Sequence, residues 1–199
     1  MFPRLLCLLA LFSVSALAQQ VTLPLPRLLT IMPMGGQAGQ NVEVTITGEN
    51  IEDVTELTFS SPKITAKPVA GATSKFTVSI AADAPVGVYD ARVMSRLGVS
   101  SVRVFSVGKL TEVVRTKANN TLETALPLPL GTICNATMTK RAVDFYSFQG
   151  VKGQAVAIDC AAVGIDSRLT PVLILADGKG ADLKVNRTGG MIDFTPPAD

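Results

Sequence analysis

Asp144 is the acidic residue best placed for chemistry, because it stands between apolar residues in the segment Val143–Phe148. A carboxylate there can supply one oxygen to Ca²⁺, but a hard cation of this kind requires several oxygens. The alternative is that Asp144 accepts hydrogen bonds from the amides of a turn, which is the role the sequence favours. Other acids that could contribute oxygens have spacings that match no EF-hand loop: Asp159, Asp166, Asp177 and Asp182. We therefore predict no metal site beyond this single Ca²⁺ candidate, and no cofactor.

Histidine is absent from the sequence. Its absence removes the usual general base, the Ser-His and Cys-His schemes of nucleophile activation, and the commonest zinc ligand. Ser106 and Lys109 have the S-x-x-K spacing of Ser/Lys acyl enzymes, but they stand where a strand gives way to a linker and cannot share a helical face. We predict that the chain has no catalytic residues and is not an enzyme.

Cys134 and Cys160 are the two thiols that remain once the N-terminal segment containing Cys7 is set aside. In an exported chain an even pair predicts a disulfide. Such a bridge closes a loop of about 27 residues, for which the chain-entropy model gives about 3.5 kcal/mol of stabilisation. The alternative is two buried free thiols on adjacent strands.

Asp166-Ser-Arg168 is a charged tripeptide that could suggest a recognition loop. The sequence favours a local turn in which Arg168 pairs with Asp166 or another carboxylate at the surface, a contact worth about 0 to 1 kcal/mol.

The N-terminus has the pattern of a secretory signal peptide over residues 1–18. Arg4 is followed by the apolar run LLCLLALFSVSALA, which ends in the small-x-small site Ala16-Leu17-Ala18. The run is too short for a permanent membrane span, so we expect cleavage before Gln19 and export without lipid attachment. Residues 19–27 then form a short extended lead-in containing proline.

Short strands separated by turn residues follow from residue 28 to residue 107. Val42, Val44 and Ile46 alternate with polar residues, the period-two pattern of a half-buried strand. Further strands are predicted at Val54–Phe59, Phe76–Ile80, Val88–Met94 and Val99–Val107. With 47% hydrophobic residues in 199, the chain can bury a substantial core, and we predict an all-β sandwich.

This segment resembles the immunoglobulin-like IPT/TIG family. The residues that carry the resemblance are turn glycines and core positions: Met32-Pro33-x-Gly35-Gly36-x-x-Gly39, the run from Val42 to Gly48, Leu57-Thr-Phe59, Ala84-Pro85-x-Gly87-x-Tyr89, and Gly98 to Val107. They imply a fold and say little about function.

Residues 108–130 are predicted to form a linker. Asn120 and Glu123 have the spacing of a helix N-cap and its third helical residue, which predicts a short helical turn that must end before Pro127.

A second set of strands begins at Gly131, and we place a second β-sandwich over residues 131–199. The segment from Gly153 to Gly178 is read as its middle. Val156, Ile158 and Cys160 form one face of a half-buried strand, whereas Val172–Leu175 is apolar throughout and predicts a strand covered on both sides. A tight turn is expected at Asp177-Gly178.

The second half resembles the bacterial pre-peptidase C-terminal (PPC) domain, a small jelly-roll-like β-sandwich found in exported proteins. The matching positions are Asn119-Asn-Thr-x-Glu123-Thr-Ala125, Gly131-x-Ile133, Asp144-Phe-Tyr146-x-Phe148, Gly153-Gln-x-Val156-x-Ile158, Asp166-Ser-Arg-Leu169 and Asp177-Gly178. Some members bind Ca²⁺, but many carry an acid where this chain has Ala142, which weakens that role for Asp144. Members also continue into further strands, so we expect this sequence to be a fragment of a longer protein.

The 18 basic and 16 acidic residues are scattered and give a net charge of +2, which predicts no nucleic-acid partner. Tryptophan is absent and the two tyrosines lie in strand patterns, so a platform for stacking sugars is not expected. We predict non-catalytic modules of a periplasmic, cell-surface or extracellular protein, acting in spacing, adhesion or folding support. Expected partners are other domains of the same protein, or an extracellular protein or polysaccharide. The alternative is an accessory region of a secreted hydrolase, most plausibly a peptidase, whose catalytic domain lies outside this chain.

Overall fold

The computed structural model describes residues 23–162 and 164–197. All regular structure in these residues is β-strand, and none of it is helical, so the all-β prediction is confirmed. The predicted signal peptide over residues 1–18 lies outside the described residues. Within the described ranges, no helix is long and apolar enough to cross a membrane.

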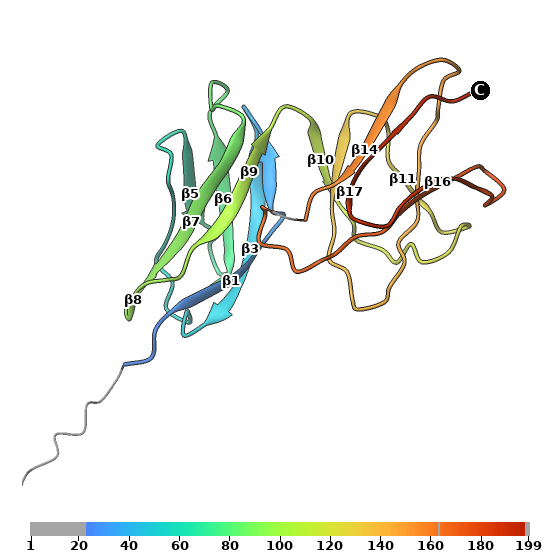
Figure 1. Ribbon diagram of the computed structural model, residues 1–199. Helices are drawn as coiled ribbons and strands as arrows, with labels where there is room; N and C mark the ends of the chain where they lie inside the picture. Colours follow the sequence, from blue (N-terminus) through green and yellow to red (C-terminus); the bar gives the residue numbers. More distant parts are fainter. Residues whose placement is uncertain (1–22, 163, 198–199) are drawn as a thin grey trace, which may run out of the picture.

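The strands between Arg27 and Gly108 form two sheets that face each other (Figure 1). One sheet has the order β1 (Arg27–Met32), β3 (Asn41–Glu49), β6 (Lys75–Ile80), β5 (Ile64–Pro68). The other has the order β2 (Gly35–Gln37), β9 (Arg103–Gly108), β7 (Gly87–Ser95), β4 (Glu56–Phe59), with β8 (Gly98–Val99) paired to β7. The β2–β9 pair is parallel, and the other pairs of these two sheets are antiparallel.

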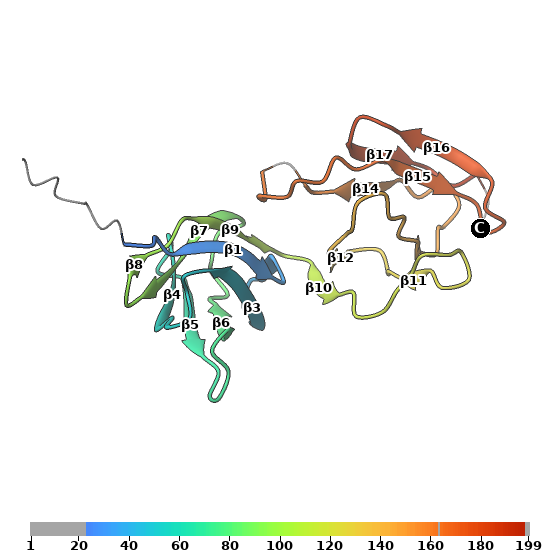
Figure 2. The ribbon, with the colours of Figure 1, turned by 90° about the horizontal axis from the view of Figure 1, so that it is seen from below.

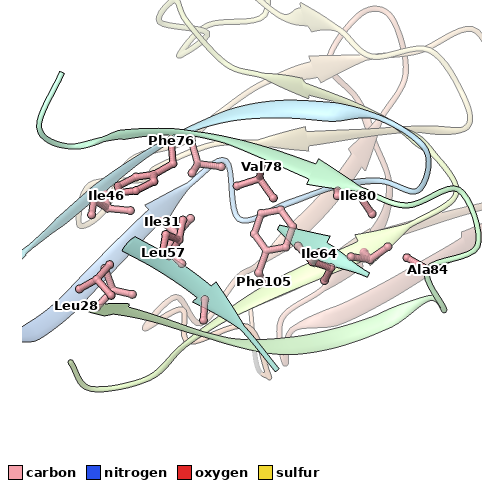
Figure 3. Packing of buried hydrophobic residues seen from close by; sticks show 14 residues of the cluster. Leu28, Ile31, Ile46, Leu57, Ile64, Phe76, Val78, Ile80, Ala84 and Phe105 are labelled. Atoms are coloured by element: carbon pink, nitrogen blue, oxygen red, sulfur yellow. The ribbon is translucent and has the colours of Figure 1, made fainter. Parts of the chain in front are cut away.

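The core of this first sandwich follows from the period-two pattern of its strands. In β3, Val44 and Ile46 are 0% and 2% exposed, while the polar residues between them face outward. Both sheets contribute to one cluster of buried apolar side chains, with Phe105 at its centre (Figure 3). The Phe105 ring meets Phe59 edge to face, with centroids 5.2 Å apart.

The second half consists of four sheets of two strands each. Two pairs are parallel: β10 (Thr111–Val114) with β12 (Thr132–Asn135), and β11 (Leu126–Pro127) with β13 (Tyr146–Ser147). Two are antiparallel: β14 (Val156–Cys160) with β17 (Gly190–Phe194), and β15 (Leu173–Ala176) with β16 (Asp182–Asn186). Among its described residues the buried apolar ones are few: Val156, Ala162, Pro171, Leu175, Ile192 and Pro196.

The predictions for the segment from Gly153 to Gly178 are confirmed in part. Val156 in β14 is buried and its neighbour Ala157 is exposed, as the alternation requires. Asp177 begins the turn of the β15–β16 hairpin, where its amide donates to the Ala181 carbonyl at 2.9 Å. The strand expected to be covered on both sides is not, because Val172 and Ile174 are 51% and 55% exposed. The continuous apolar run therefore leaves one face of this hairpin in solvent.

The region predicted to be a linker is partly strand, and the predicted helical turn is present as a short turn that does not extend into a helix. Residues 111–114 form β10, which pairs with β12. The turn has two backbone hydrogen bonds, from Thr124 to the Thr121 carbonyl and from Ala125 to the Leu122 carbonyl, both at 3.2 Å. Its first residue is Thr121, whose hydroxyl accepts the Thr124 amide at 3.3 Å, where the sequence predicted Asn120 as the cap. Leu126–Pro127 then enters β11 and pairs with β13, so the turn ends there.

Candidate functional site

Asp144 lies in the segment that precedes β13 and forms a buried ion pair with Arg115, which follows β10. Arg115 Nη1 lies 2.7 Å from Asp144 Oδ1, and the two side chains are 17% and 6% exposed, respectively. Asp144 Oδ2 is buried and has no hydrogen-bond partner among the described residues. The sequence favoured turn amides as the partners of this carboxylate, whereas its partner in the structure is the Arg115 guanidinium.

Arg115 is the centre of a polar network that joins three segments of the second half. Its Nη1 also donates to Asn119 Oδ1 at 3.0 Å, and its Nη2 donates to the Thr137 carbonyl. Asn119 is 2% exposed and returns a hydrogen bond from Nδ2 to the Phe145 carbonyl at 2.8 Å. Apart from Asp144 Oδ2, these groups satisfy one another, and the network holds the chain around β12 and β13 in place.

Two ionisable groups border this network and both are held in the protonated form at neutral pH. Burial, with smaller contributions from the Cys134 thiol and Asp144, raises the pKa of Tyr146 to about 12. Burial also raises the pKa of the Cys134 thiol. A protonated thiol is a poor nucleophile. Both groups can therefore donate hydrogen bonds, but neither is activated for attack.

The network borders a hollow of about 510 Å³. Its lining includes Arg115, Asp144 and the segment from Thr137 to Thr139. The charges of Arg115 and Asp144 compensate each other, so the hollow offers hydroxyl and amide groups without a net charge from this pair.

The hollow does not fit a metal ion. Arg115 already occupies Asp144 Oδ1, and a second cation there would be repelled. No three or more His, Cys, Asp or Glu side chains within residues 23–162 and 164–197 are grouped to hold a metal. Asp159, Asp166, Asp177 and Asp182 therefore do not gather around Asp144, and we derive no Ca²⁺ chemistry from this site.

Cys134 and Cys160 are both free thiols in the structure, whereas the sequence predicts a disulfide between them. Cys134 lies on β12, which pairs with β10, and Cys160 ends β14, which pairs with β17. Because the two strands belong to different sheets, their cysteines are not brought together by strand pairing. Burial raises the pKa of the Cys160 thiol, as it does that of Cys134. The bridge stays a prediction of the sequence that this structure does not form.

Asp166 has partners that the sequence analysis missed. Its Oδ2 accepts the backbone amide of Val104 at 3.0 Å and lies 3.9 Å from Arg103 Nη1. The expected pairing with Arg168 was local, whereas the actual partners belong to the first sandwich. No sequence signal marks a contact across 62 residues, because it depends on how the two halves meet.

The comparison with protein-family models gives no match, and the comparison with curated proteins gives none either. A solved structure to which the chain is similar is that of SGBP-B from the Bacteroides ovatus mixed-linkage glucan utilization locus, in complex with a mixed-linkage heptasaccharide. The two are 14% identical with a TM-score of 0.32, over 83% of this chain and 34% of that one. The chain thus spans about a third of that protein, and a likeness of this extent does not determine what this chain binds.

Proposed function

We propose that the chain is a pair of non-catalytic β-sandwich modules that serves as a spacer, adhesion or folding-support part of a larger exported protein. In this proposal the first module is IPT/TIG-like and the second is PPC-like. Their partners are other domains of the same protein, or an extracellular protein or polysaccharide.

The observation that carries the proposal is the route of the main chain between the two halves. β9 ends at Gly108 and β10 begins at Thr111, so two residues separate a strand of the first sandwich from a strand of the second half. One of these, Lys109, accepts a hydrogen bond at its carbonyl from Gln37 Nε2 at 2.9 Å. A connection held in this way has few free torsions, so it keeps the two modules at a set separation, as a spacer requires.

Two features of the first sandwich support its immunoglobulin-like assignment. Its sheet orders, β1-β3-β6-β5 and β9-β7-β4 with β2 at the edge, match the ABED and GFC sheets of immunoglobulin constant domains. Tyr89, near the start of β7, donates its hydroxyl hydrogen bond to the Pro85 carbonyl at 2.6 Å. This is the arrangement called a tyrosine corner, found at the equivalent strand of such sandwiches.

The charge pairing and protonation of the groups around the hollow in the second half support a non-catalytic role. Its carboxylate is paired with Arg115, and the neighbouring Tyr146 and Cys134 have raised pKa values. An enzyme needs the opposite arrangement, in which an acid, base or nucleophile is poised to exchange a proton near the working pH.

Distance measurement between spin labels tests the spacer role. Labels at Glu52→Cys in the first module and Lys179→Cys in the second, in a background with Cys7→Ser, Cys134→Ser and Cys160→Ser, report the separation of two exposed positions. We expect one narrow distance distribution. As a matched control, four glycines inserted between Lys109 and Leu110 should broaden it. A distribution already as broad without the insertion would contradict the spacer role.

An activity screen tests the non-catalytic part of the proposal. The purified chain is assayed against broad panels of peptide and ester substrates, and we expect no turnover above that of a heat-unfolded sample. Turnover that a single substitution in the hollow, such as Asp144→Asn, abolishes while the chain stays folded would contradict it.

A further inference from the structure

The sheet containing β2 and β9 has an edge that its own strands leave open. β2 starts at Gly35, which is level with Ser106 of β9, so the part of β9 before Ser106 has no β2 residue beside it. Val104 lies in that part, and its amide receives no partner from β2. Met34, just ahead of β2, likewise presents its amide outward. Open amides of this kind are where another strand can pair with a sheet.

Two side chains of the second half accept these amides. Asn135 Oδ1 accepts the Met34 amide at 2.9 Å, and Asp166 Oδ2 accepts the Val104 amide at 3.0 Å. Asn135 ends β12, and Asp166 belongs to the connection between β14 and β15. In both views this connection extends from the second half toward the first sandwich (Figures 1 and 2).

Asn135 is held in position by a second hydrogen bond. Its Nδ2 donates to Glu112 Oε2 at 2.7 Å, so the amide group bridges β10 and the first sandwich. Gly35 lies close to both halves: a Cβ there would lie 2.5 Å from the Ser106 carbonyl oxygen of β9 and 3.2 Å from Glu112 Oε1. A side chain at this position would first displace β2 from β9 and would also crowd the Glu112 carboxylate that holds Asn135.

Asp166 is oriented by charge as well as by its hydrogen bond. Arg103 Nη1 lies 3.9 Å from Asp166 Oδ2, and the Arg103 side chain is fixed by bonds from Nε to the Leu29 carbonyl and from Nη1 to the Val102 carbonyl. Asp166 has a backbone φ of 58°, in the left-handed region that an aspartate adopts more readily than most residues. The carboxylate therefore faces a fixed cation and a fixed amide together.

We propose that Asn135 and Asp166 form a two-point latch that docks the second half onto the open edge of the first sandwich, fixes the angle between the two and blocks that edge to other strands. The first contact, from Asn135 to the Met34 amide, lies at the β2 end of the edge, and the second, from Asp166 to the Val104 amide, lies along β9. Two separated contacts prevent the second half from rotating about either one, which a single linker cannot do. The latch goes beyond the spacer role, because that role rests on the short connection between β9 and β10 and requires no side-chain contact between the two halves.

Amide hydrogen exchange in the full chain, followed by NMR, tests the latch directly. Asp166→Ala should speed exchange at Val104 by about tenfold or more, and Asn135→Ala should do the same at Met34, since each amide loses its acceptor. Each substitution should also speed exchange at the other amide, because a docked unit opens cooperatively. Asp182→Ala, which removes an exposed carboxylate from β16, is the matched control and should leave both rates unchanged.

Three results would overturn the proposal. One is an unchanged exchange rate of the Val104 amide in Asp166→Ala. Another is faster exchange only at the amide whose own acceptor was removed, with no effect at the other amide. The third is a general rise in exchange across β3 and β6, which would mean that the first sandwich itself has unfolded. Asp166→Asn keeps an oxygen acceptor without the charge, so it should recover most of the protection at Val104 if the chain is folded.

The spin-label distance separates the latch from the spacer role. If the latch fixes the two halves, removing it with the double substitution Asp166→Ala and Asn135→Ala should broaden the distance distribution between the labels at positions 52 and 179. If the double variant keeps the narrow distribution of the parent chain, the latch is wrong while the spacer role stands. Size-exclusion chromatography with light scattering on the double variant should further show self-association, since the edge is then open to a second copy.

Discussion

The two halves of this protein are built from similar strands but are stabilised differently. The first sandwich surrounds one continuous cluster of buried apolar side chains contributed by both sheets, whereas the described part of the second half buries few apolar residues: Val156, Ala162, Pro171, Leu175, Ile192 and Pro196. The second half instead contains the Arg115–Asp144 network. Hydrophobic burial therefore stabilises the first half. Polar contacts, both inside the second half and between the two halves, stabilise much of the second half.

Truncating a core side chain should reveal the largest contrast between the halves. Phe105→Ala removes a fully buried ring at the centre of the first sandwich and should lower its free energy of unfolding by about 3–5 kcal/mol. Ile174→Ala in the second half should cost less than about 1 kcal/mol, because that side chain is 55% exposed. Denaturant unfolding followed by circular dichroism measures both, and equal costs would contradict the contrast.

Breaking the buried ion pair should destabilise the second half selectively. Asp144→Ala leaves the Arg115 guanidinium buried without its counter-charge, and we expect a loss of roughly 2–4 kcal/mol. The double substitution Arg115→Met with Asp144→Leu should recover much of this loss, because no unpaired charge remains. Hydrogen exchange in β12 and β13 reports the effect, which should leave β3 and β6 unchanged. A comparable rise in β3 would show that the halves unfold as one unit.

Titration of Tyr146 sharpens the comparison at high pH. Because Tyr146 has a pKa of about 12 in the folded chain and about 10 when unfolded, the unfolded state loses its proton first as the pH rises. Stability of the second half should therefore fall from about pH 10 and level off near pH 12. Tyr146→Phe should remove this contribution. If the variant shows the same pH dependence as the parent chain, the loss of stability at high pH is caused by other groups.

Tyr89→Phe should have a small effect that is confined to the first sandwich. It removes one hydrogen bond, from the Tyr89 hydroxyl to the Pro85 carbonyl, and keeps the ring. We expect a loss of about 1 kcal/mol in the first sandwich and none in the second half. Thermal unfolding measures it, with Thr58→Val, which removes a hydroxyl that donates to the Arg92 carbonyl at 3.3 Å, as a comparison on the same sandwich.

Sequence reasoning succeeded where a local pattern decides the structure. Period-two alternation located β3 and β14, and the Asp177-Gly178 pair marked the turn between β15 and β16. It placed no strand at Ile64–Pro68, where β5 is a short edge strand whose alternation covers only four residues before Pro68. It also predicted a helical turn near Asn120, which the structure keeps as two turn hydrogen bonds before β11 pairs with β13.

The site shows the same division between local and long-range information. Asp144 was singled out because an acid among apolar residues is unusual, but its partner lies 29 residues away in Arg115. Asp166 was read as a local turn and instead meets Val104 across 62 residues. Such partners are set by the register of the strands and by the docking of the two halves. Neither of these produces a periodic pattern in a single sequence.

The parallel pairing of β2 with β9 has a mechanical consequence. β2 comes soon after the point where the chain enters the first sandwich, and β9 leads out of it toward β10. Tension along the polypeptide would therefore draw these two strands in opposite directions along their shared length. Their interstrand hydrogen bonds would be loaded together in shear, and we expect single-molecule stretching to show one abrupt rupture of this sandwich instead of gradual unzipping.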